Sequence, residues 1–274
     1  MMPEVADADV RPVAPGRPKP SPAGALDRSR VLLGMSAVGG VTVVVTLVVR
    51  ALGDAGWARG LALVLGLVVI PLVASPIEWI VHRFVYHQAV LRPLGAIFTV
   101  HTAHHFAFFP TWRYVTSGPA RRLSICRGRP DVHESRLRNA GVRAAHFGWY
   151  MGIGAVVVWA PAWLVTRSTP FLVGLVAGSA LVSNLFIVVH DTIHRPGSHR
   201  VVEAQPWFAF LDRHHFIHHV DLGANLNFLL PLADALFGTL RTSLTAEEEA
   251  RHGTVDEAKA RPVGSGERAR VALS

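Results

Sequence analysis

The sequence predicts an all-α integral-membrane protein, with about four transmembrane helices and a histidine-rich helical cap on the cytoplasmic side. Half of the 274 residues are hydrophobic and only 17% are charged, which is low for a soluble domain. Four segments are apolar over about 20 residues, the length of helix that crosses the hydrocarbon core of a bilayer. The formal net charge of +8 comes largely from Lys and Arg beside these segments. Their placement indicates membrane topology, and nucleic acid is not expected as a partner.

The two ends of the chain differ from its middle. Residues 1–30 are rich in Pro, Ala and Arg without apolar periodicity, so they are predicted to be a disordered cytoplasmic tail. The first apolar stretch begins at Val31 and is about as long as a span, which argues against a cleaved signal peptide. Residues 245–274 are charged and turn-rich, and we expect a second disordered tail there. Residues 31–244 are therefore predicted to form one membrane-embedded domain.

The spans are expected near residues 31–50, 60–80, 145–165 and 170–190. Lys and Arg number five, two, ten, one and nine in the regions that flank and connect these spans, counted from the N-terminus. Cytoplasmic regions carry the excess of Lys and Arg, so this alternation places both tails and the long middle loop in the cytoplasm. Within that loop, residues 91–109 are too few to span and are interrupted by proline, which favours an interfacial or re-entrant helix.

Histidine is the unusual residue of this chain. There are 15 histidines and a single cysteine, Cys126, which excludes an intrachain disulfide framework and a cysteine-based zinc cluster. Ten histidines fall into four short groups, each at the cytoplasmic end of an expected span or beyond it. All ten are therefore expected on the cytoplasmic side. These candidate metal ligands are His82, His87, His101, His104, His105, His190, His194, His215, His218 and His219.

The spacing within each group predicts which side chains share a face. Residues three and four apart lie on one face of a helix, so the groups at 101–105 and 215–219 each direct three imidazoles one way. The third group does the same with two. His82 and His87 are five residues apart and would diverge by about 140° on a regular helix. They suit either two different metals or a helix end that is locally distorted.

This set of imidazoles is large enough for two metals. Imidazole binds Fe, Zn, Cu and Ni, and a single closed zinc site needs only four ligands. Soluble di-iron bundles use Glu with Glu-x-x-His, but no carboxylate here has matching spacing, so a nearly all-nitrogen site is expected. Glu78, one turn before His82, is placed to accept a ring N–H, and His214 could replace His215 as a ligand. The candidates for residues that orient the ligands are Glu78, Asp191, His214 and Asp221.

The four groups read HxxxxH, HxxHH, HxxxH and HxxHH in this order. At these residues the chain resembles the fatty acid hydroxylase and sterol desaturase superfamily of membrane di-iron enzymes. The segment Glu78–Phe84 is similar to the one that leads into the first motif of that superfamily, and Pro231–Thr239 is similar to its closing segment. The resemblance covers roughly residues 60–240.

The resemblance implies an O2-dependent oxidoreductase with two iron ions held by the ten histidines. It implies hydroxylation of an unactivated C–H bond in a lipid-like substrate of the fatty acyl, sterol or carotenoid class. Electrons are expected from a separate ferredoxin-type or cytochrome b5-type donor. Fatty acid 2-hydroxylases carry Tyr-Asp where this chain has residues 186–189, and a Trp in place of Ala233, whereas His190 and Asp191 resemble the start of a carotenoid hydroxylase motif. The substrate class therefore stays open.

Other functions are compatible with clustered histidines. A desaturase of the same superfamily would use the same site. A membrane haem or metal-binding protein that transfers electrons is a second class, although haem proteins place paired histidines within their spans. A zinc hydrolase would need fewer ligands, an open position and a general base. A metal carrier would need ionisable residues within the spans, which contain almost none.

Overall fold

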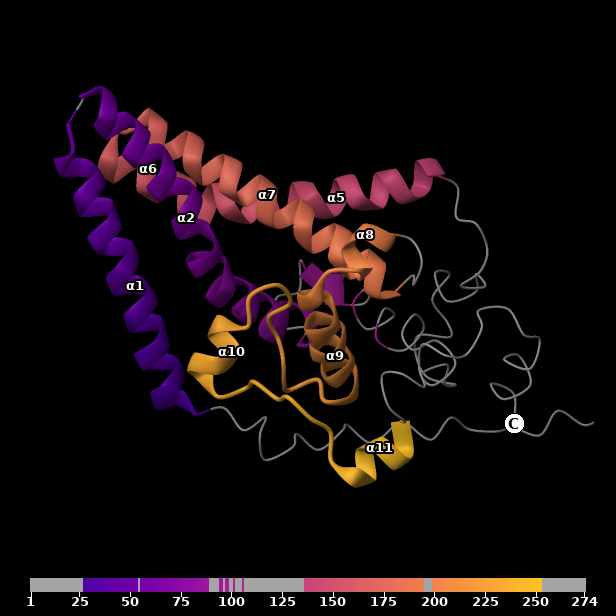
Figure 1. Ribbon diagram of the computed structural model, residues 1–274. Helices are drawn as coiled ribbons and strands as arrows, with labels where there is room; N and C mark the ends of the chain where they lie inside the picture. The colour runs from indigo at the N-terminus through magenta and orange to yellow at the C-terminus, as the bar shows by residue number, and fades with distance from the viewer. Residues whose placement is uncertain are drawn as a thin grey trace, which may run out of the picture.

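The protein is described by a computed structural model that covers residues 27–53, 55–88, 94, 95, 97, 98, 101, 105, 136–194 and 199–252 (Figure 1). Within those residues every regular element is helical. Four helices are long and apolar enough to cross a membrane: Arg28–Ala51, Gly56–Tyr86, Arg143–Thr166 and Thr169–Ile193. They coincide with the four spans expected from the sequence. An all-helical fold with four helices able to span a membrane is thus confirmed for the described residues, while the cytoplasmic cap and the orientation of the ends stay predictions.

The elements divide into long helices and a short-helix segment. The long ones are α1 (Arg28–Ala51), α2 (Gly56–Val81) with its π-helical extension η2 (His82–Tyr86), the continuous run of α5 (Arg136–Gly154), η7 (Ala155–Trp159) and α6 (Ala160–Thr166), and α7 (Thr169–His194). We call these the bundle. The short ones are α8 (Arg200–Glu203), α9 (Pro206–Val220), α10 (Leu232–Phe237) and α11 (Ala246–His252). Residues 199–252 are called the C-terminal segment.

The helix α1 begins earlier than the expected boundary at Val31. Asp27 is its N-cap, and the Asp27 Oδ1 atom accepts hydrogen bonds from the N–H groups of Ser29 and Arg30 at 3.0 and 3.2 Å. An N-cap carboxylate satisfies amides that the first helical turn leaves without partners, so the helix starts at Arg28. The rest of the N-terminal tail, residues 1–26, lies outside the described residues.

A short helix also occupies the start of the expected C-terminal tail. At α11, Thr245 Oγ1 accepts a hydrogen bond from the Glu248 N–H at 3.2 Å, and Glu248 Oε2 accepts one from the Thr245 N–H at 2.7 Å. This reciprocal pair is a capping box, which the sequence Thr-x-x-Glu encodes. Arg241 reinforces it by donating to Glu248 at 2.7 Å. Residues after 252 lie outside the described part of the chain.

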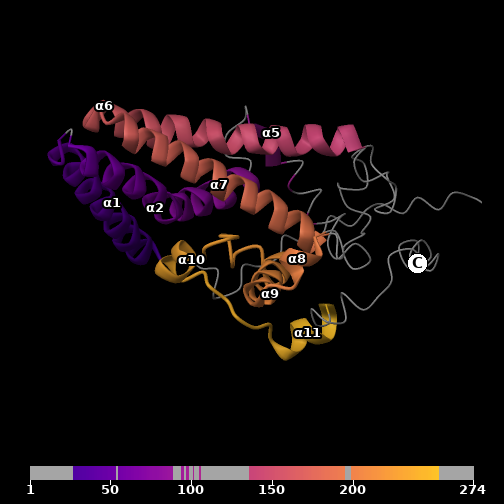
Figure 2. The same cartoon turned by 45° about the horizontal axis from the view of Figure 1, so that its top comes forward.

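The bundle is organised around the pair α2 and α7, which run side by side (Figures 1 and 2). Two glycines allow this close approach. A Cβ atom at Gly66 would collide with the backbone of α7 at Phe171, and one at Gly174 would collide with the Leu63 carbonyl of α2. Small residues at such crossings let helix backbones touch, which is how helices associate where surrounding lipid is as apolar as the side chains.

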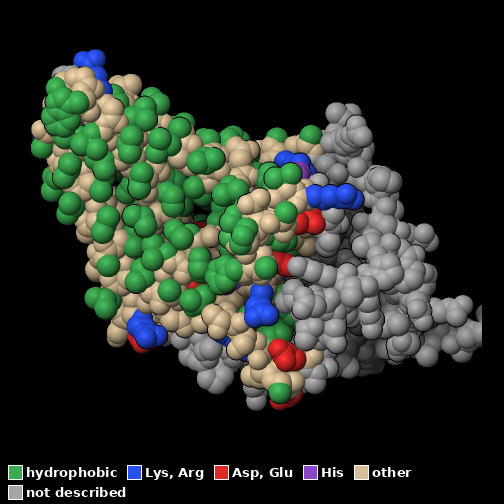
Figure 3. Space-filling view, in the orientation of Figure 1, with side chains coloured by type: hydrophobic (Ala, Val, Ile, Leu, Met, Phe, Trp, Pro, Cys, Tyr) green, Lys and Arg blue, Asp and Glu red, His purple; other side chains and the backbone are tan. Residues whose placement is uncertain are grey.

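The bundle and the C-terminal segment differ in what they expose. Hydrophobic side chains cover the long helices, and the charged side chains visible in Figure 3 lie near the ends of these helices and on the C-terminal segment. The loops after Ala51 and after Thr166 lie at one end of the bundle, and α8–α11 lie toward the other (Figure 1). The second and fourth spans both end at this second end, and their last turns carry histidines.

Candidate metal centre

The first pair of histidines is brought together by a change in helix type. At η2 the N–H of His87 donates to the carbonyl of His82, five residues back, at 3.1 Å. The two rings then stack with centroids 4.9 Å apart instead of diverging. Of the two alternatives for this pair, the structure has the distorted helix end. Such π-turns are rare and frequently occur at functional sites.

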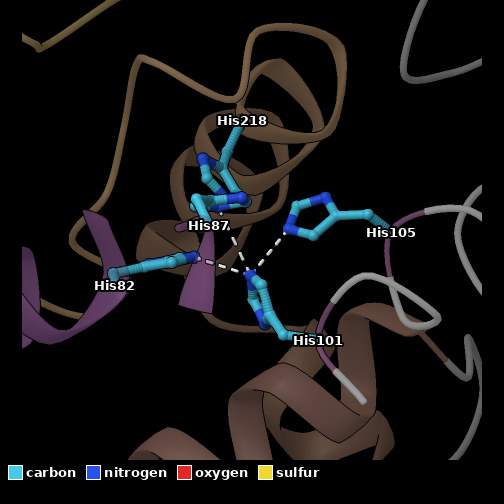
Figure 4. A group of neighbouring side chains, drawn as sticks. All are labelled: His82, His87, His101, His105 and His218. Carbon is cyan, nitrogen blue, oxygen red and sulfur yellow. Dashed lines mark hydrogen bonds between the residues drawn. The ribbon is translucent and has the colours of Figure 1, made fainter. Parts of the chain in front are cut away.

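Five histidines from three parts of the chain converge at this point (Figure 4). One nitrogen from each ring lies within 4.8 Å of the corresponding nitrogen of every other ring, which is compatible with a shared metal ion. Three of the five residues are buried and two are half-buried. The group, which we call the five-histidine cluster, consists of His82, His87, His101, His105 and His218.

The inward-facing atoms of the cluster are Nε2 atoms at short separations. His101 Nε2 lies 3.1 Å from that of His82, 3.3 Å from that of His87 and 2.9 Å from that of His105. The Nε2 atoms of His87 and His218 are 3.2 Å apart. A single N–H can serve only one or two such contacts, so this crowding of nitrogen atoms is the arrangement that a bound cation would satisfy best.

Two backbone carbonyls fix the outer nitrogens of the cluster. His82 Nδ1 lies 2.6 Å from the Leu226 oxygen, and His218 Nδ1 lies 2.7 Å from the Ala224 oxygen. A carbonyl only accepts, so each ring carries its proton on Nδ1 and directs the Nε2 lone pair inward. Metal-bound histidines are oriented in this way by their outer nitrogen. The donor set therefore fits a metal ion.

Burial also keeps these rings in the state that binds metals. The pKa of His105 is held well below its usual value, first by burial and then by the neighbouring histidines, among which His219 contributes most. The pKa of His218 is lowered in the same way, by burial and then by His82. Since only the neutral imidazole has a free lone pair, both rings can coordinate a metal at neutral pH.

Three more predicted ligands adjoin the cluster. His215 and His219 are one turn apart on α9, and their Nε2 atoms are 3.0 Å apart. The His190 ring of α7 lies 5.0 Å from the His215 ring, and the His219 ring lies 4.3 Å from that of His105. Eight of the ten predicted ligands thus form one continuous group. His104 lies outside the described residues, as does the side chain of His194, the last residue of α7.

Glu78 does not hold His82, contrary to the expectation from its spacing. Its carboxylate accepts hydrogen bonds from the Phe228 N–H at 2.9 Å and from the Asn227 side-chain amide at 3.4 Å. The His82 ring instead uses a backbone carbonyl of the loop after α9. Glu78 therefore positions that loop, and its effect on the histidine is indirect.

The other three orienting candidates also have partners outside the cluster. Asp191 pairs with Arg143 of α5, and Asp221 accepts from Arg241 at 2.8 Å. His214 Nε2 donates to the Asn227 carbonyl at 2.7 Å, and burial lowers its pKa to about 4. The His214 ring faces the loop after α9, and His215 is the residue that joins the other histidines. This agrees with the HxxHH spacing, which the group at 215–219 shares with that at 101–105.

The carboxylate of Asp234, a residue of α10, controls the loop that carries these carbonyls. It is fully buried and accepts from the N–H of Leu226 at 2.9 Å, from that of Asn227 at 2.7 Å and from the Thr239 hydroxyl at 2.6 Å. Burial raises the pKa of Asp234 to about 6, and these hydrogen bonds limit the rise. Asp234 thereby fixes the Leu226 backbone, whose carbonyl holds His82.

Sequence reasoning missed these loop residues. Asn227 donates to the Ser75 carbonyl at 2.6 Å, and Asn225 donates to the His214 carbonyl at 3.0 Å, so both amides tie the loop to helices. Asn225 also has a left-handed backbone, with φ of 52°, which asparagine tolerates better than most residues. Two features of the sequence could have indicated them. Asn225 and Asn227 stand in an otherwise apolar stretch, and Asp234 stands among apolar residues of the closing segment.

The fold and this site define a helical protein with four helices able to span a membrane and with a histidine cluster, at one end of its bundle, that could bind metal. Comparison with models of known families, with curated proteins and with solved structures finds no match. The function must therefore be argued from the site.

Proposed function

We propose that the protein is a membrane-bound, non-haem di-iron oxygenase that hydroxylates an unactivated C–H bond of a lipid-like substrate. The observation that supports it best is the convergence of five imidazoles, with three more beside them, at one end of an apolar bundle. A single metal ion rarely takes more than six ligands, so eight neighbouring rings favour two ions. The order of the four histidine motifs supports iron as the metal.

The residues of the chain have three roles in this proposal. The histidines hold the metals, with His82 and His218 oriented by loop carbonyls. Phe228 covers one side, because its ring lies 5.3 Å from that of His190 and 5.0 Å from that of His215, and its burial keeps water away. When bound, the iron pair would supply the reduction of O2 by two external electrons and two protons, giving one alcohol and one water.

A membrane-dissolved substrate agrees with where the cluster lies. His82 and His190 lie in the last turns of spans and the other histidines gather around them, so a lipid would need to move little to place an alkyl carbon beside the site. The charge alternation supports a cytoplasmic location of this end, where a soluble ferredoxin-type or b5-type donor would deliver electrons. The same site could remove a second hydrogen and give an alkene, so the product identifies the reaction.

The test is metal analysis of the purified protein combined with mass spectrometry of lipids from a host that expresses it. We expect about two irons per chain and a lipid product heavier by one oxygen, labelled by 18O2. The His218→Ala variant should lose metal and product. Expressed protein with two irons and an unchanged lipid profile in a host supplied with a donor would contradict the proposal.

Two other results of these measurements would replace the proposed oxygenase by a different function. Absorbance in the Soret region would favour a haem protein that transfers electrons. Zinc as the sole bound metal would favour a hydrolase. An alkene in place of an alcohol would keep the site and change only the reaction, from hydroxylation to desaturation.

A further inference from the structure

The two ends of helix α9 differ in exposure. Its C-terminal half carries the buried histidines, and its first turns carry Trp207 and Phe210, which are 42% and 46% exposed. These aromatic residues are three apart and therefore adjacent on the helix surface. Large exposed aromatic rings are unusual in water and common where a protein meets the membrane interface.

A groove of about 220 Å³ lies beside these aromatic residues, between α9 and α7. Every residue that lines it is apolar: Leu185, Trp207, Phe210, Leu211 and Leu229. Leu185 belongs to the fourth membrane-spanning segment and is 43% exposed. The groove is thus continuous with the lipid-facing surface of α7, where Leu181, one turn earlier, is 65% exposed.

The groove and the histidines adjoin the same packed hydrophobic residues. Leu211 precedes His215 by one turn of α9, a rise of about 6 Å. Leu229 follows Phe228, whose ring contacts both His190 and His215. The wall of the groove and the cover of the metal centre are therefore the same packed cluster of hydrophobic residues.

A larger hollow, of about 370 Å³, lies between α1, α2, α6 and α7. Its lining residue nearest in sequence to the cluster is Val73, nine residues before His82, a rise of about 13 Å along α2. The smaller groove is therefore the one placed next to the metal centre.

We propose that the groove between α7 and α9 binds the alkyl chain of a bilayer lipid, and that this chain is the one oxidised at the metal centre. The second part rests on the proposed function. A polar or charged occupant would lose its hydration against this lining without gaining hydrogen bonds. A soluble protein partner would have to insert beside Leu185, within a membrane-spanning segment. An alkyl chain from the bilayer meets neither obstacle.

Fluorescence quenching tests the occupant. The full-length protein is reconstituted in dioleoylphosphatidylcholine vesicles, with or without phosphatidylcholine that carries brominated acyl chains. The emission lost in Trp207→Phe isolates the signal of Trp207. We expect bromine to quench this signal strongly and aqueous iodide to leave it nearly unchanged. Quenching by iodide with no effect of bromine would place the groove in water and overturn the proposal.

Filling the groove tests whether its occupant is the substrate. Leu185→Trp adds bulk to an exposed groove position, and Leu181→Trp adds the same bulk one turn away on the same helix. We expect about tenfold less oxygenated lipid from Leu185→Trp and an unchanged amount from Leu181→Trp, with equal iron in both. Equal product from the two variants would mean that the groove holds ordinary lipid, and would overturn the proposal.

The wild-type chain separates this result from a failure of the proposed function. If the wild type binds no iron and forms no oxygenated lipid, the proposed function is wrong, and with it the claim that the groove chain is a substrate. If the wild type forms product and only the groove variants disagree with expectation, the proposed function stands and the groove proposal fails.

Discussion

The bundle and the C-terminal segment are held together by different forces. In the bundle, α2 and α7 meet through glycines and apolar side chains, and exposed residues such as Val68 and Leu181 are hydrophobic. In the C-terminal segment, Asp234 and Asn227 are almost fully buried and each makes several hydrogen bonds. Apolar contacts are not directional, whereas a fully satisfied polar network specifies one arrangement of its members.

This difference explains where the metal centre is built. The bundle supplies His82 and His190 at one end. The Leu226 carbonyl of the C-terminal segment orients the His82 ring, and the His190 ring contacts both Phe186 of α7 and Phe228 of the C-terminal segment. The spans therefore bring ligands to the same end of the bundle, and the loop after α9 helps to set their orientation. Substitutions in the bundle and in this loop should then have separable effects on stability and on metal binding.

The largest effect is expected from removing a ligand. His218→Ala should lower metal affinity by more than about 100-fold, because loss of a mere orienting partner already costs about 10–100-fold. Helix content should stay unchanged, since the bundle does not depend on this ring. Metal content after dialysis against a chelator, with circular dichroism, measures both. The control is His146→Ala, an exposed histidine on α5, which should keep full metal.

The next largest effect is expected from the buried carboxylate. Asp234→Ala leaves the amides of Leu226 and Asn227 without acceptors, which should lower the free energy of unfolding by about 3 kcal/mol. It should also weaken metal binding by about 10–100-fold through His82. Thermal unfolding in detergent and metal titration measure the two effects.

A graded variant sharpens this prediction. Thr239→Val keeps the volume but removes one of the three donors to Asp234 and the acceptor of the buried Trp79 N–H, so the unfolding free energy should fall by about 2 kcal/mol. Metal affinity should change little, because the two amide bonds to the loop remain. If Asp234→Ala destabilised the fold but left metal affinity at the wild-type value, the loop would not orient His82.

An intermediate effect is expected at the glycine contact of the bundle. Gly174→Ala places a methyl group against the Leu63 carbonyl and should destabilise the protein by about 1–3 kcal/mol. Gly60→Ala, on α2, has no atom within 4 Å of the added methyl and should be neutral or stabilising by up to about 1 kcal/mol. Both folded variants should keep the metal. Loss of metal from folded Gly174→Ala would contradict the separation of the two regions.

The sequence predicted the bundle well because its signal is local. Four apolar stretches of span length fix the number and place of the spans, whatever the packing. Histidine spacing likewise predicted that the groups at 101–105 and 215–219 present several rings to one point, and the described members of both groups lie together. Helical periodicity is enough for both conclusions.

The loop after α9 could not be predicted because its partners are distant in sequence. Glu78 and Phe228 are 150 residues apart, and Ser75 and Asn227 are 152 apart. Spacing suggested that Glu78 would hold His82, its neighbour by one turn, but a buried carboxylate bonds whichever amides the fold brings to it. The π-turn at His82 was likewise only one of two readings, because five-residue spacing alone does not select it.

The smallest effect is expected at the outer edge of the C-terminal segment, where the ion pair between Arg241 and Glu248 attaches α11. Hydrogen bonds and charge attraction from Arg241 lower the pKa of Glu248 to about 2. A depressed carboxylate pKa stabilises the folded state above its unfolded value of about 4.3, and this contribution is lost as the pH falls through about 2. Because the pair is near the surface, Glu248→Gln should cost less than about 1 kcal/mol at pH 7.

Amide hydrogen exchange over α11, measured from neutral pH down to pH 2 after correction for intrinsic rates, checks the sign. The wild type should be better protected than Glu248→Gln at neutral pH, and the two should converge at the acid end. Metal content should be equal in the wild type and Glu248→Gln at neutral pH, because Glu248 is linked to the end of α9 through Arg241 and Asp221 and is not one of the metal ligands. A difference in protection that persisted unchanged at pH 2 would mean that the carboxylate charge is not what attaches α11.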